Sequence, residues 1–281
     1  MNNMLLRAIS GSVYVAVIVL CIIFGPRWFT LLTGVFGVIG INEVVKMFNG
    51  TESRGSVVAQ YLDLLFFAVV LLLPYMTFVA GNDTAFMILI VLAALYIPVR
   101  MIAAVGQKGD NTLRQVAGAF FGLIYVGLPL LMVNTAYIIS WALNRNIVIS
   151  VMLVSFVLIW LNDTGAYLSG RTFGRHKLCE RLSPKKTWEG FWGGFALCIV
   201  ASVVYAFVSG LNPVTSGCYG AVVSVASTFG DLFESLIKRK CGVKDSGTLI
   251  PGHGGVLDRI DSFLAVAPLA VLMLLASETL L

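Results

Sequence analysis

The stretch from Asp231 to Asp261 reads DLFESLIKRKCGVKDSGTLIPGHGGVLDRID, and the interpretation of the whole chain starts from it. It lies between two segments that are apolar enough to cross a bilayer. Its acidic residues are Asp231, Glu234, Asp245, Asp258 and Asp261. Carboxylates are costly inside a membrane and mark functional sites there, and a glycine-rich turn such as PGHGG lets a backbone approach a phosphate closely. The stretch therefore indicates metal-assisted phosphate chemistry at a membrane surface.

The composition of the chain excludes a soluble globular domain. The 281 residues are 58% hydrophobic and 12% charged, with a mean hydropathy of +0.92. The apolar runs each approach the ~20 residues that a helix needs to cross the hydrocarbon. We predict an all-α, polytopic integral membrane protein with nine transmembrane helices and a polar active-site cavity that faces the cytoplasm. The predicted spans are about 8–25, 28–48, 57–79, 84–105, 116–140, 147–169, 188–209, 217–239 and 260–280.

We expect residues 1–281 to form a single membrane domain. Scaffold helices are predicted over 1–140 and catalytic helices over 147–281. Glu43 and Asp63 fall near span ends, where solvated or snorkelling carboxylates are expected. Several glycines of the first half allow close helix contact and leave open a homodimer surface, namely Gly34, Gly37, Gly40, Gly118 and Gly122.

The basic residues are distributed asymmetrically about the predicted spans. The N-terminus and the even-numbered loops contain all 19 Lys and Arg residues except Arg27 and Arg145. By the positive-inside rule this side faces the cytoplasm. We therefore predict a multi-pass protein of the cell (inner) membrane whose N-terminus and active site are cytoplasmic. The net charge of +5 describes a cationic membrane face, which suits anionic lipid and nucleotide, so no nucleic-acid partner is expected.

Polar residues recur every three or four positions along one face of the predicted span 217–239. They are Ser224, Ser227 or Thr228, Asp231, Glu234 or Ser235, and Lys238. A polar stripe on an apolar helix must face the interior of a bundle or a wet cavity. The sequence therefore predicts that this face lines a site.

Asp258 and Asp261 are three residues apart and open the last predicted helix on one face. Asp231 is expected at a comparable depth on the preceding helix. Three carboxylates this close repel one another, so a bound cation is the natural compensation. We predict that Asp231, Asp258 and Asp261 hold Mg²⁺, a cation that prefers oxygen ligands. The carboxylates suffice for a second cation without requiring one.

The loop before the seventh span combines lysines with a predicted helix start. Ser183 is a predicted N-cap, and Pro184 fits the first helical position. A helix N-terminus with lysines and hydroxyls suits a triphosphate, so Ser183, Lys185, Lys186 and Thr187 are predicted to contact a nucleotide. The alternative is that these lysines only fix the topology.

Asn162 and Asp163 lie in the cytoplasmic half of the sixth predicted span, about two turns before Arg171. An amide and a carboxylate at that depth fit two explanations. They either contact substrate or cap a partner helix.

The motif Ser235-Leu-Ile-Lys238-Arg239, Lys244-Asp245-x-Gly247, Pro251-x-His253-Gly254-Gly255-x-x-Asp258-Arg259-x-Asp261 resembles the signature of the phosphatidate cytidylyltransferases, the CDP-diacylglycerol synthases. The pattern is followed without departure over residues 235–261. An Asn-Asp pair followed by GR and by a basic SPKKTWEG loop recurs in the same family. The resemblance therefore favours substrate contact by Asn162 and Asp163.

The resemblance implies an Mg²⁺-dependent enzyme of phospholipid biosynthesis. This enzyme transfers the cytidylyl group of CTP to phosphatidic acid, giving CDP-diacylglycerol and pyrophosphate, within a lipid bilayer. The implied catalytic residues are Asp231, Asp258, Asp261, Lys244 and Asp245. Further implied substrate contacts are Lys238, Arg239, His253, Gly254, Gly255 and Arg259. Alternatively, His253 packs within the turn, and Arg259 pairs with a neighbouring Asp.

Two rival functions fit the residues. A cation-coupled transporter also uses intramembrane carboxylates, although here the charges gather at one end and no inverted repeat is visible. A polyprenol or phytol kinase that uses CTP is the other rival. The fate of α-labelled CTP separates these possibilities.

The charge distribution generates a topological prediction. A cysteine placed at Asn212, in a loop that lacks Lys and Arg, should react with a membrane-impermeant thiol reagent only from the external side. A cysteine placed at Ser183 should react only from the cytoplasmic side. Reversed labelling would overturn the span count and the predicted position of the site.

Overall fold

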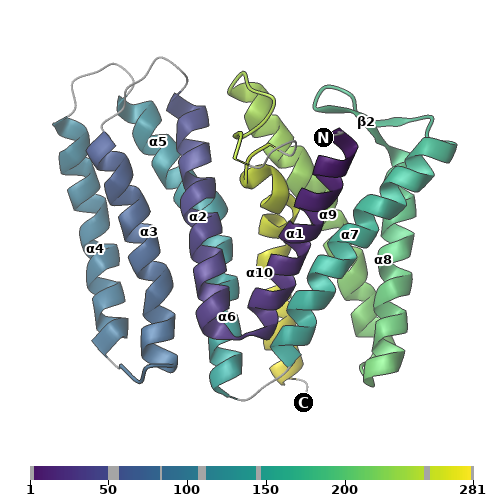
Figure 1. Ribbon diagram of the computed structural model, residues 1–281, viewed down its shortest axis with the longest axis horizontal. Helices are drawn as coiled ribbons and strands as arrows, with labels where there is room; N and C mark the ends of the chain where they lie inside the picture. Colours follow the sequence, from purple (N-terminus) through teal and green to yellow (C-terminus); the bar gives the residue numbers. More distant parts are fainter. Residues whose placement is uncertain are drawn as a thin grey trace. The chain divides into compact units, whose positions relative to one another are not determined.

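The computed structural model describes residues 3–49, 57–82, 84–106, 112–143, 147–249 and 254–279. Most of these residues are helical, and Figure 1 colours the helices in chain order. In order, they are α1 (Asn3–Ile23), α2 (Pro26–Asn49), α3 (Val57–Phe78), α4 (Thr84–Val105), α5 (Thr112–Gly122), the π-helical turn η1 (Leu123–Gly127), α6 (Leu128–Ala142), α7 (Ile147–Phe173), α8 (Trp188–Ser209), α9 (Pro213–Lys240) and α10 (Leu257–Thr279).

The predicted all-α class is confirmed, because each predicted span overlaps one helical stretch. Among the described residues, seven helices are long and apolar enough to cross a membrane. They are Pro26–Asn49, Ala59–Phe78, Met87–Val105, Thr112–Ala142, Val151–Phe173, Trp188–Ser209 and Pro213–Lys240. This arrangement is compatible with a polytopic membrane protein, and the full set of nine spans stays a prediction.

The predicted helix start at Ser183 is wrong. Residues Ser183–Thr187 form strand β2, which pairs antiparallel with strand β1 (Lys177–Cys179). The fixed φ of Pro184 is tolerated in an edge strand, and its carbonyl accepts a hydrogen bond from Lys177 Nζ at 2.6 Å. Helix α8 starts at Trp188, and Thr187 is its N-cap, with Oγ1 accepting from the Gly190 amide at 3.1 Å.

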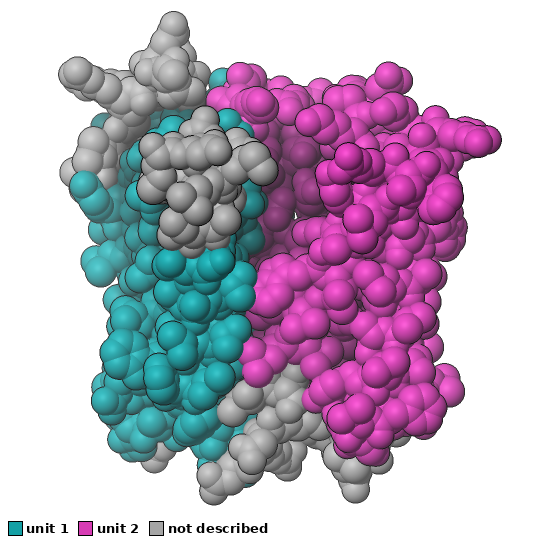
Figure 2. Space-filling view, turned by 45° about the vertical axis from the view of Figure 1, so that its right-hand side comes forward, with its two compact units in different colours: residues 1–149, 245–259 teal, residues 150–244, 260–281 magenta. Residues whose placement is uncertain are grey.

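The chain divides into two compact units, which Figure 2 distinguishes by colour. Unit 1 comprises Met1–Ile149 and Asp245–Arg259, and unit 2 comprises Ser150–Lys244 and Ile260–Leu281. The long motif around the last loop is therefore split, because its middle part belongs to unit 1 and its two ends belong to unit 2.

In unit 1, α2 packs against α1, α3, α5 and α6, and α3 packs against α4. The interior contains polar groups that are paired with one another. Asn134 accepts a hydrogen bond from Thr30 Oγ1 at 2.9 Å and donates to the Leu71 carbonyl at 3.1 Å. These bonds connect α6 with α2 and α3 and meet the requirement that buried polar groups be hydrogen-bonded.

The interpretation of Glu43 and Asp63 as solvated carboxylates is wrong, because both side chains are buried in unit 1, with exposed fractions of 6% and 1%. Asp63 Oδ1 lies 2.9 Å from Arg100 Nε and accepts from the Tyr96 hydroxyl at 2.9 Å. Glu43 accepts three hydrogen bonds from the loop before α10 and from the start of that helix. Each carboxylate has partners far away in the sequence, which its position near a span end did not indicate.

In unit 2, α8 packs along α9. The polar stripe of α9 is confirmed as an interior face, because five of its members are buried: Ser224, Ser227, Thr228, Glu234 and Lys238. Asp231 and Ser235, on the same stripe, are half-buried. The opposite side of the helix exposes apolar side chains, among them Val222, Val225, Phe229 and Phe233. Helix α9 therefore presents an apolar face outward and a polar face inward, as an intramembrane site requires.

Candidate active site

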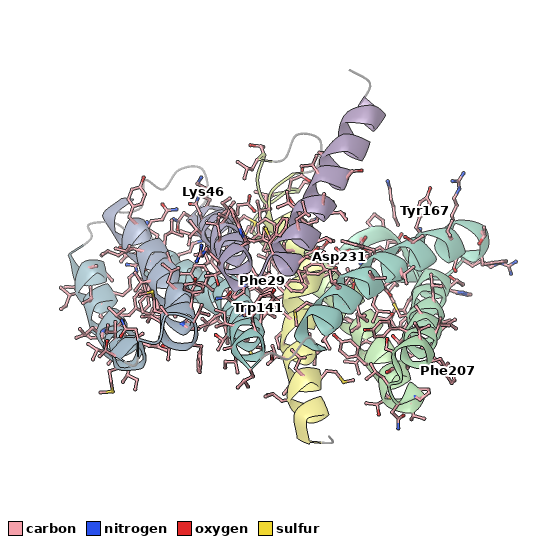
Figure 3. The ribbon with its side chains drawn as sticks, turned by 60° about the horizontal axis from the view of Figure 1, so that its bottom comes forward. Phe29, Lys46, Trp141, Tyr167, Phe207 and Asp231 are labelled. Carbon is pink, nitrogen blue, oxygen red and sulfur yellow. The ribbon has the colours of Figure 1, made fainter. Side chains whose placement is uncertain are left out.

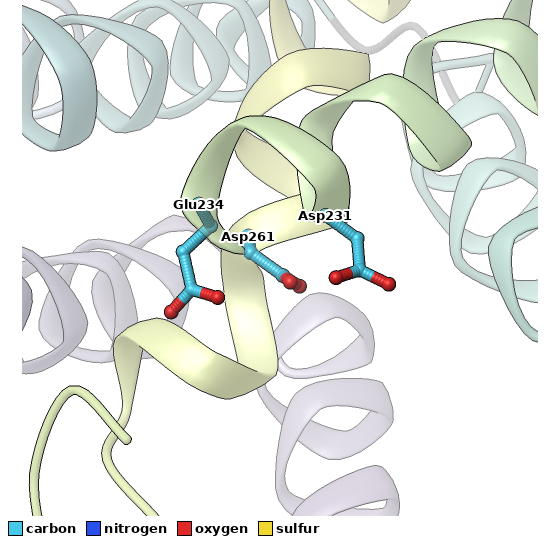
Figure 4. Close-up of side chains that lie close together, drawn as sticks. All are labelled: Asp231, Glu234 and Asp261. Atoms are coloured by element: carbon cyan, nitrogen blue, oxygen red, sulfur yellow. The ribbon is translucent and has the colours of Figure 1, made fainter. Parts of the chain in front are cut away.

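Three carboxylates of unit 2 meet at one place, and we call Asp231, Glu234 and Asp261 the acidic cluster. One carboxylate oxygen from each residue lies within 4.8 Å of the others (Figure 4). Asp231 and Glu234 are three residues apart on α9 and therefore share a face. Gly230 permits the approach of α10, because a Cβ at this position would lie only 3.1 Å from the Asp261 carbonyl oxygen. Helix packing without a side chain at Gly230 thus brings Asp261 to α9.

Two lysines compensate the charge of the acidic cluster. Lys186 Nζ lies 2.5 Å from Asp231 Oδ2, and Lys238 forms an ion pair with Glu234 four residues earlier on α9. Like charges about 4 Å apart repel by ~4 kcal/mol at an effective dielectric constant of 20. Three carboxylates at this spacing therefore need nearby positive charge. Beside these ammonium groups, the three carboxyl groups still offer oxygen donors to a cation.

A pocket of about 260 Å³ opens in unit 2 beside the acidic cluster. We call it the basic pocket, and its polar lining residues are Asn162, Asp163, Lys185, Lys186, Thr187 and Thr228. The rim includes Tyr167, which projects from α7 (Figure 3). Lys186 belongs both to the lining of the pocket and to the ion pair with Asp231. The pocket and the cluster are therefore parts of one site.

The β1–β2 hairpin positions the lysines of the basic pocket. Strand β2 leads directly into the N-terminus of α8, so Lys185 and Lys186 stand immediately before the positive end of a helix dipole. The Glu189 carboxylate accepts from the backbone amides of Arg175 and His176, at 3.1 Å and 3.2 Å, and lies 2.7 Å from His176 Nδ1. These bonds tie the chain before the hairpin to the first turn of α8.

Asn162 and Asp163 have different surroundings. Asn162 is 2% exposed, and its Oδ1 accepts from Ser224 Oγ at 2.6 Å while its Nδ2 donates to Thr228 Oγ1 at 3.3 Å. Its amide thus connects α7 with α9, which is the kind of helix-linking contact that the alternative explanation expected. Asp163 is exposed at the basic pocket. Of the pair, Asp163 is the residue placed to meet a ligand.

The predicted metal triad is divided between the units. Asp231 and Asp261 join Glu234 in unit 2, whereas Asp258 belongs to unit 1. Asp258 Oδ2 accepts from the Ser246 amide at 3.0 Å, from the Ser246 hydroxyl at 3.0 Å and from the Gly255 amide at 2.8 Å. In the structure, this carboxylate therefore orders the loop that precedes α10.

The remaining predicted site residues lie on the connection between α9 and α10 or next to it. Arg239 is exposed and donates to the Val243 carbonyl at 3.1 Å. Lys244, Asp245 and Arg259 are exposed, Gly254 is partly buried with φ of +84°, and Gly255 is buried. His253 lies outside the described residues. On the hairpin, Ser183 is half-buried and Lys185 is exposed.

Sequence reasoning missed Glu234 as a member of the acidic cluster, although its three-residue spacing from Asp231 on the polar stripe was the available signal. It also missed the hairpin and the role of Glu43. The hairpin is local, but its short strands KLC and SPKKT lack the alternation of apolar and polar residues that predicts a strand. The contacts of Glu43 had no local signal, because they join residues more than 200 positions apart.

The model of the cytidylyltransferase family matches residues 5–277. The chain is 33% identical to "Phosphatidate cytidylyltransferase 4, chloroplastic" of Arabidopsis thaliana over 276 residues, which cover 89% of this chain and 68% of that protein. It is 35% identical to "Phosphatidate cytidylyltransferase 5, chloroplastic" of the same plant over 231 residues, covering 75% and 56% of the two chains.

A bacterial relative matches a shorter region more closely. Identity to the "Phosphatidate cytidylyltransferase" of Haemophilus influenzae is 48% over 123 residues, which cover 42% of this chain and 43% of that protein. The chain thus spans about two thirds of the first plant relative and about half of the other two proteins.

Proposed function

Because the chain belongs to the cytidylyltransferase family, we propose that it transfers the cytidylyl group of CTP to phosphatidic acid, as a phosphatidate cytidylyltransferase. The products are CDP-diacylglycerol and pyrophosphate. The observation that carries the proposal is that Lys186 lines the basic pocket and also pairs with Asp231 of the acidic cluster. Groups suited to phosphates and groups suited to a cation therefore share one site.

The proposed reaction requires no nucleophilic side chain from the protein. A phosphomonoester oxygen of phosphatidate attacks the α-phosphorus of CTP and forms the new P–O bond. The bond between the α-phosphorus and the oxygen that bridges to the β-phosphorus breaks, and pyrophosphate leaves with that electron pair. Because the substrate supplies its own nucleophile, the protein has to align two phosphates and neutralise their charge.

The basic pocket supports the binding of the triphosphate. Lys185 and Lys186 supply positive charge, and the first amides of α8 add the positive end of the helix dipole. The volume of about 260 Å³ lies below the ~300–1,000 Å³ of sites that enclose a whole drug-sized ligand. The pocket thus suits the phosphates of a nucleotide better than the complete molecule.

The acidic cluster fits the predicted Mg²⁺. Its donors are carboxylate oxygens, which this cation prefers, and their mutual spacing of at most 4.8 Å allows one ion to contact several of them. We propose Asp231 and Asp261 as ligands with Glu234 beside them, and the role of Asp258 as a ligand stays a prediction. When bound, Mg²⁺ neutralises phosphate charge and helps to orient the reacting groups.

We further propose that the site opens to the cytoplasm and that the chain lies in the cell's inner membrane with a cytoplasmic N-terminus. The asymmetry of Lys and Arg supports this orientation. The basic pocket and the even-numbered loops would then face the compartment that contains CTP.

The first test of the function follows the label of α-³²P-CTP. Purified protein in mixed micelles with phosphatidate should move the label into chloroform-extractable lipid and release one pyrophosphate per labelled lipid. A lipid kinase would leave the label in CDP, and a transporter would leave CTP unchanged. Either of these outcomes would overturn the proposal.

Lys186→Ala should raise the apparent KM for CTP ~10-fold or more, because a charge-assisted contact contributes about 1.5–3 kcal/mol. The KM for phosphatidate should change much less. Lys240→Ala removes an exposed lysine at the end of α9 and serves as the matched control, with both KM values retained. Equal changes in both KM values, or no change, would mean that Lys186 only helps to fix the membrane topology and does not bind CTP.

Asp231→Asn and Asp261→Asn should each lower kcat at least ~10²-fold, the scale of a lost electrostatic contribution to the transition state. Asp258→Asn should do the same, whereas Glu234→Gln should have a milder effect, because Glu234 is fully buried while Asp231 and Asp261 are partly exposed. Mn²⁺ binding followed by electron paramagnetic resonance without substrate supplies a second measurement. Glu180→Gln, an exposed hairpin carboxylate, is the control. Near-normal, Mg²⁺-dependent turnover in both Asp231→Asn and Asp261→Asn would contradict the metal site.

A further inference from the structure

A buried carboxylate of the first half of the chain holds the loop before α10. Glu43 Oε1 accepts from the Val256 amide at 3.0 Å, and Oε2 accepts from the Leu257 amide at 2.9 Å and from the Ser246 hydroxyl at 2.9 Å. All four residues belong to unit 1, and Glu43 is 6% exposed. Both oxygens of the carboxylate therefore act as acceptors for donors more than 200 residues away.

Glu43 takes the place of an N-cap for α10. The first amides of a helix have no acceptor inside the helix, and an anion near them is favoured by the helix dipole. Val256 and Leu257 provide two such amides at the start of α10, and a single side chain from α2 satisfies both. The entry point of α10 is thus fixed to α2 by a charged group.

Two glycines of the motif make room for this carboxylate. A Cβ at Gly255 would lie 2.5 Å from Glu43 Oε2 and 2.2 Å from Ser246 Oγ. A Cβ at Gly247 would lie 2.5 Å from Glu43 Oε1. Real Cβ contacts are not that short, so any side chain would displace Glu43 or the loop. The glycines at 247 and 255 are explained by the bound carboxylate, independently of any phosphate.

Ser246 joins Glu43 to Asp258. Its hydroxyl lies 2.9 Å from Glu43 Oε2 and 3.0 Å from Asp258 Oδ2. A hydroxyl carries one proton and donates to one acceptor at a time, so the two carboxylates compete for the same donor. Asp258 additionally receives the Ser246 and Gly255 amides. The loop is thus held from one side by Glu43 and from the other by Asp258.

We propose that Glu43 is a positioning residue for the cytidylyl transfer. It acts through Ser246 and the start of α10, and it sets the direction in which the Asp258 carboxylate points. Because Glu43 also accepts from the Ser246 hydroxyl, the loop would keep an anchor if Asp258 gave up its share of that donor. The kinetic part of this inference rests on the proposed function, whereas the structural part does not.

Glu43→Gln is the decisive variant, since it keeps the size of the side chain. In this variant one carboxylate oxygen becomes an NH₂ group, which cannot accept a hydrogen bond. At least one of the three donors to residue 43 therefore loses its acceptor. We expect a ~10-fold or larger fall in kcat and a ~10-fold rise in the Mg²⁺ concentration that gives half-maximal rate. The KM for CTP should stay within about twofold of its original value.

Asp63→Asn is the matched control for the loss of a buried carboxylate in the same unit. Asp63 pairs with Arg100 and Tyr96 and has no contact with the loop before α10 among its described partners. This variant should lower the melting temperature without changing the Mg²⁺ dependence per folded molecule. Ser246→Ala removes only the shared hydroxyl and should shift the Mg²⁺ dependence in the same direction as Glu43→Gln, by a smaller factor.

Hydrogen–deuterium exchange supplies a measurement that does not depend on activity. In Glu43→Gln, peptides covering residues 254–262 should exchange faster than in the original chain, while peptides of the β1–β2 hairpin should not change. Unchanged exchange at 254–262 would overturn the inference. So would a Glu43→Gln variant that loses melting temperature but keeps the original Mg²⁺ dependence.

The two proposals fail in different ways. If the original chain transfers no label from CTP to lipid, the proposed function is wrong, and the exchange experiment alone decides whether Glu43 holds the loop. If transfer occurs and Glu43→Gln behaves like Asp63→Asn, the function stands and the positioning role is wrong.

Discussion

The cost of placing carboxylates in a membrane protein governs this structure, because each one needs a counter-charge or several hydrogen-bond donors. The chain meets the need in two ways. Asp63 pairs with Arg100, Glu234 with Lys238, and Asp231 with Lys186. Glu43 instead receives two amides and a hydroxyl. These three donors satisfy both oxygens of the Glu43 carboxylate, and through them the side chain anchors the start of α10.

The motif from Asp231 to Asp261 performs two tasks in the two units. Its ends, which belong to unit 2, contribute the carboxylates of the acidic cluster. Its middle part belongs to unit 1 and contains the loop that closes around Glu43 and Asp258. The acidic residues and the glycines of this motif therefore have different structural roles. The former concentrate charge, and the latter allow a backbone to pass close to a buried carboxylate.

The sequence predicted those features that depend on local pattern. The helices followed from apolar runs of membrane length, and the buried stripe of α9 followed from the spacing of Ser224, Thr228 and Lys238. Features that leave no such local pattern were missed. Ser183 looked like an N-cap, but pairing with β1 made it the start of a strand and moved the cap to Thr187. Glu43 looked solvated, since nothing nearby in the sequence revealed its donors beyond residue 245.

Asp258 and Asp261 have different partners, although they are only three residues apart. Three residues apart, they would share a face within a regular helix. Asp258, however, occupies the first turn of α10, where the amides of the preceding loop are within reach and bind its carboxylate. Asp261 lies one turn further on, beside Gly230 of α9, and joins Asp231 and Glu234. Lys186 then connects this cluster to the basic pocket, so the ammonium group offered to a phosphate is the one that compensates Asp231. In the proposed reaction, the Lys186 ammonium therefore interacts with both the nucleotide phosphates and the Asp231 carboxylate. Binding of the nucleotide then changes the electrostatic environment of the carboxylates.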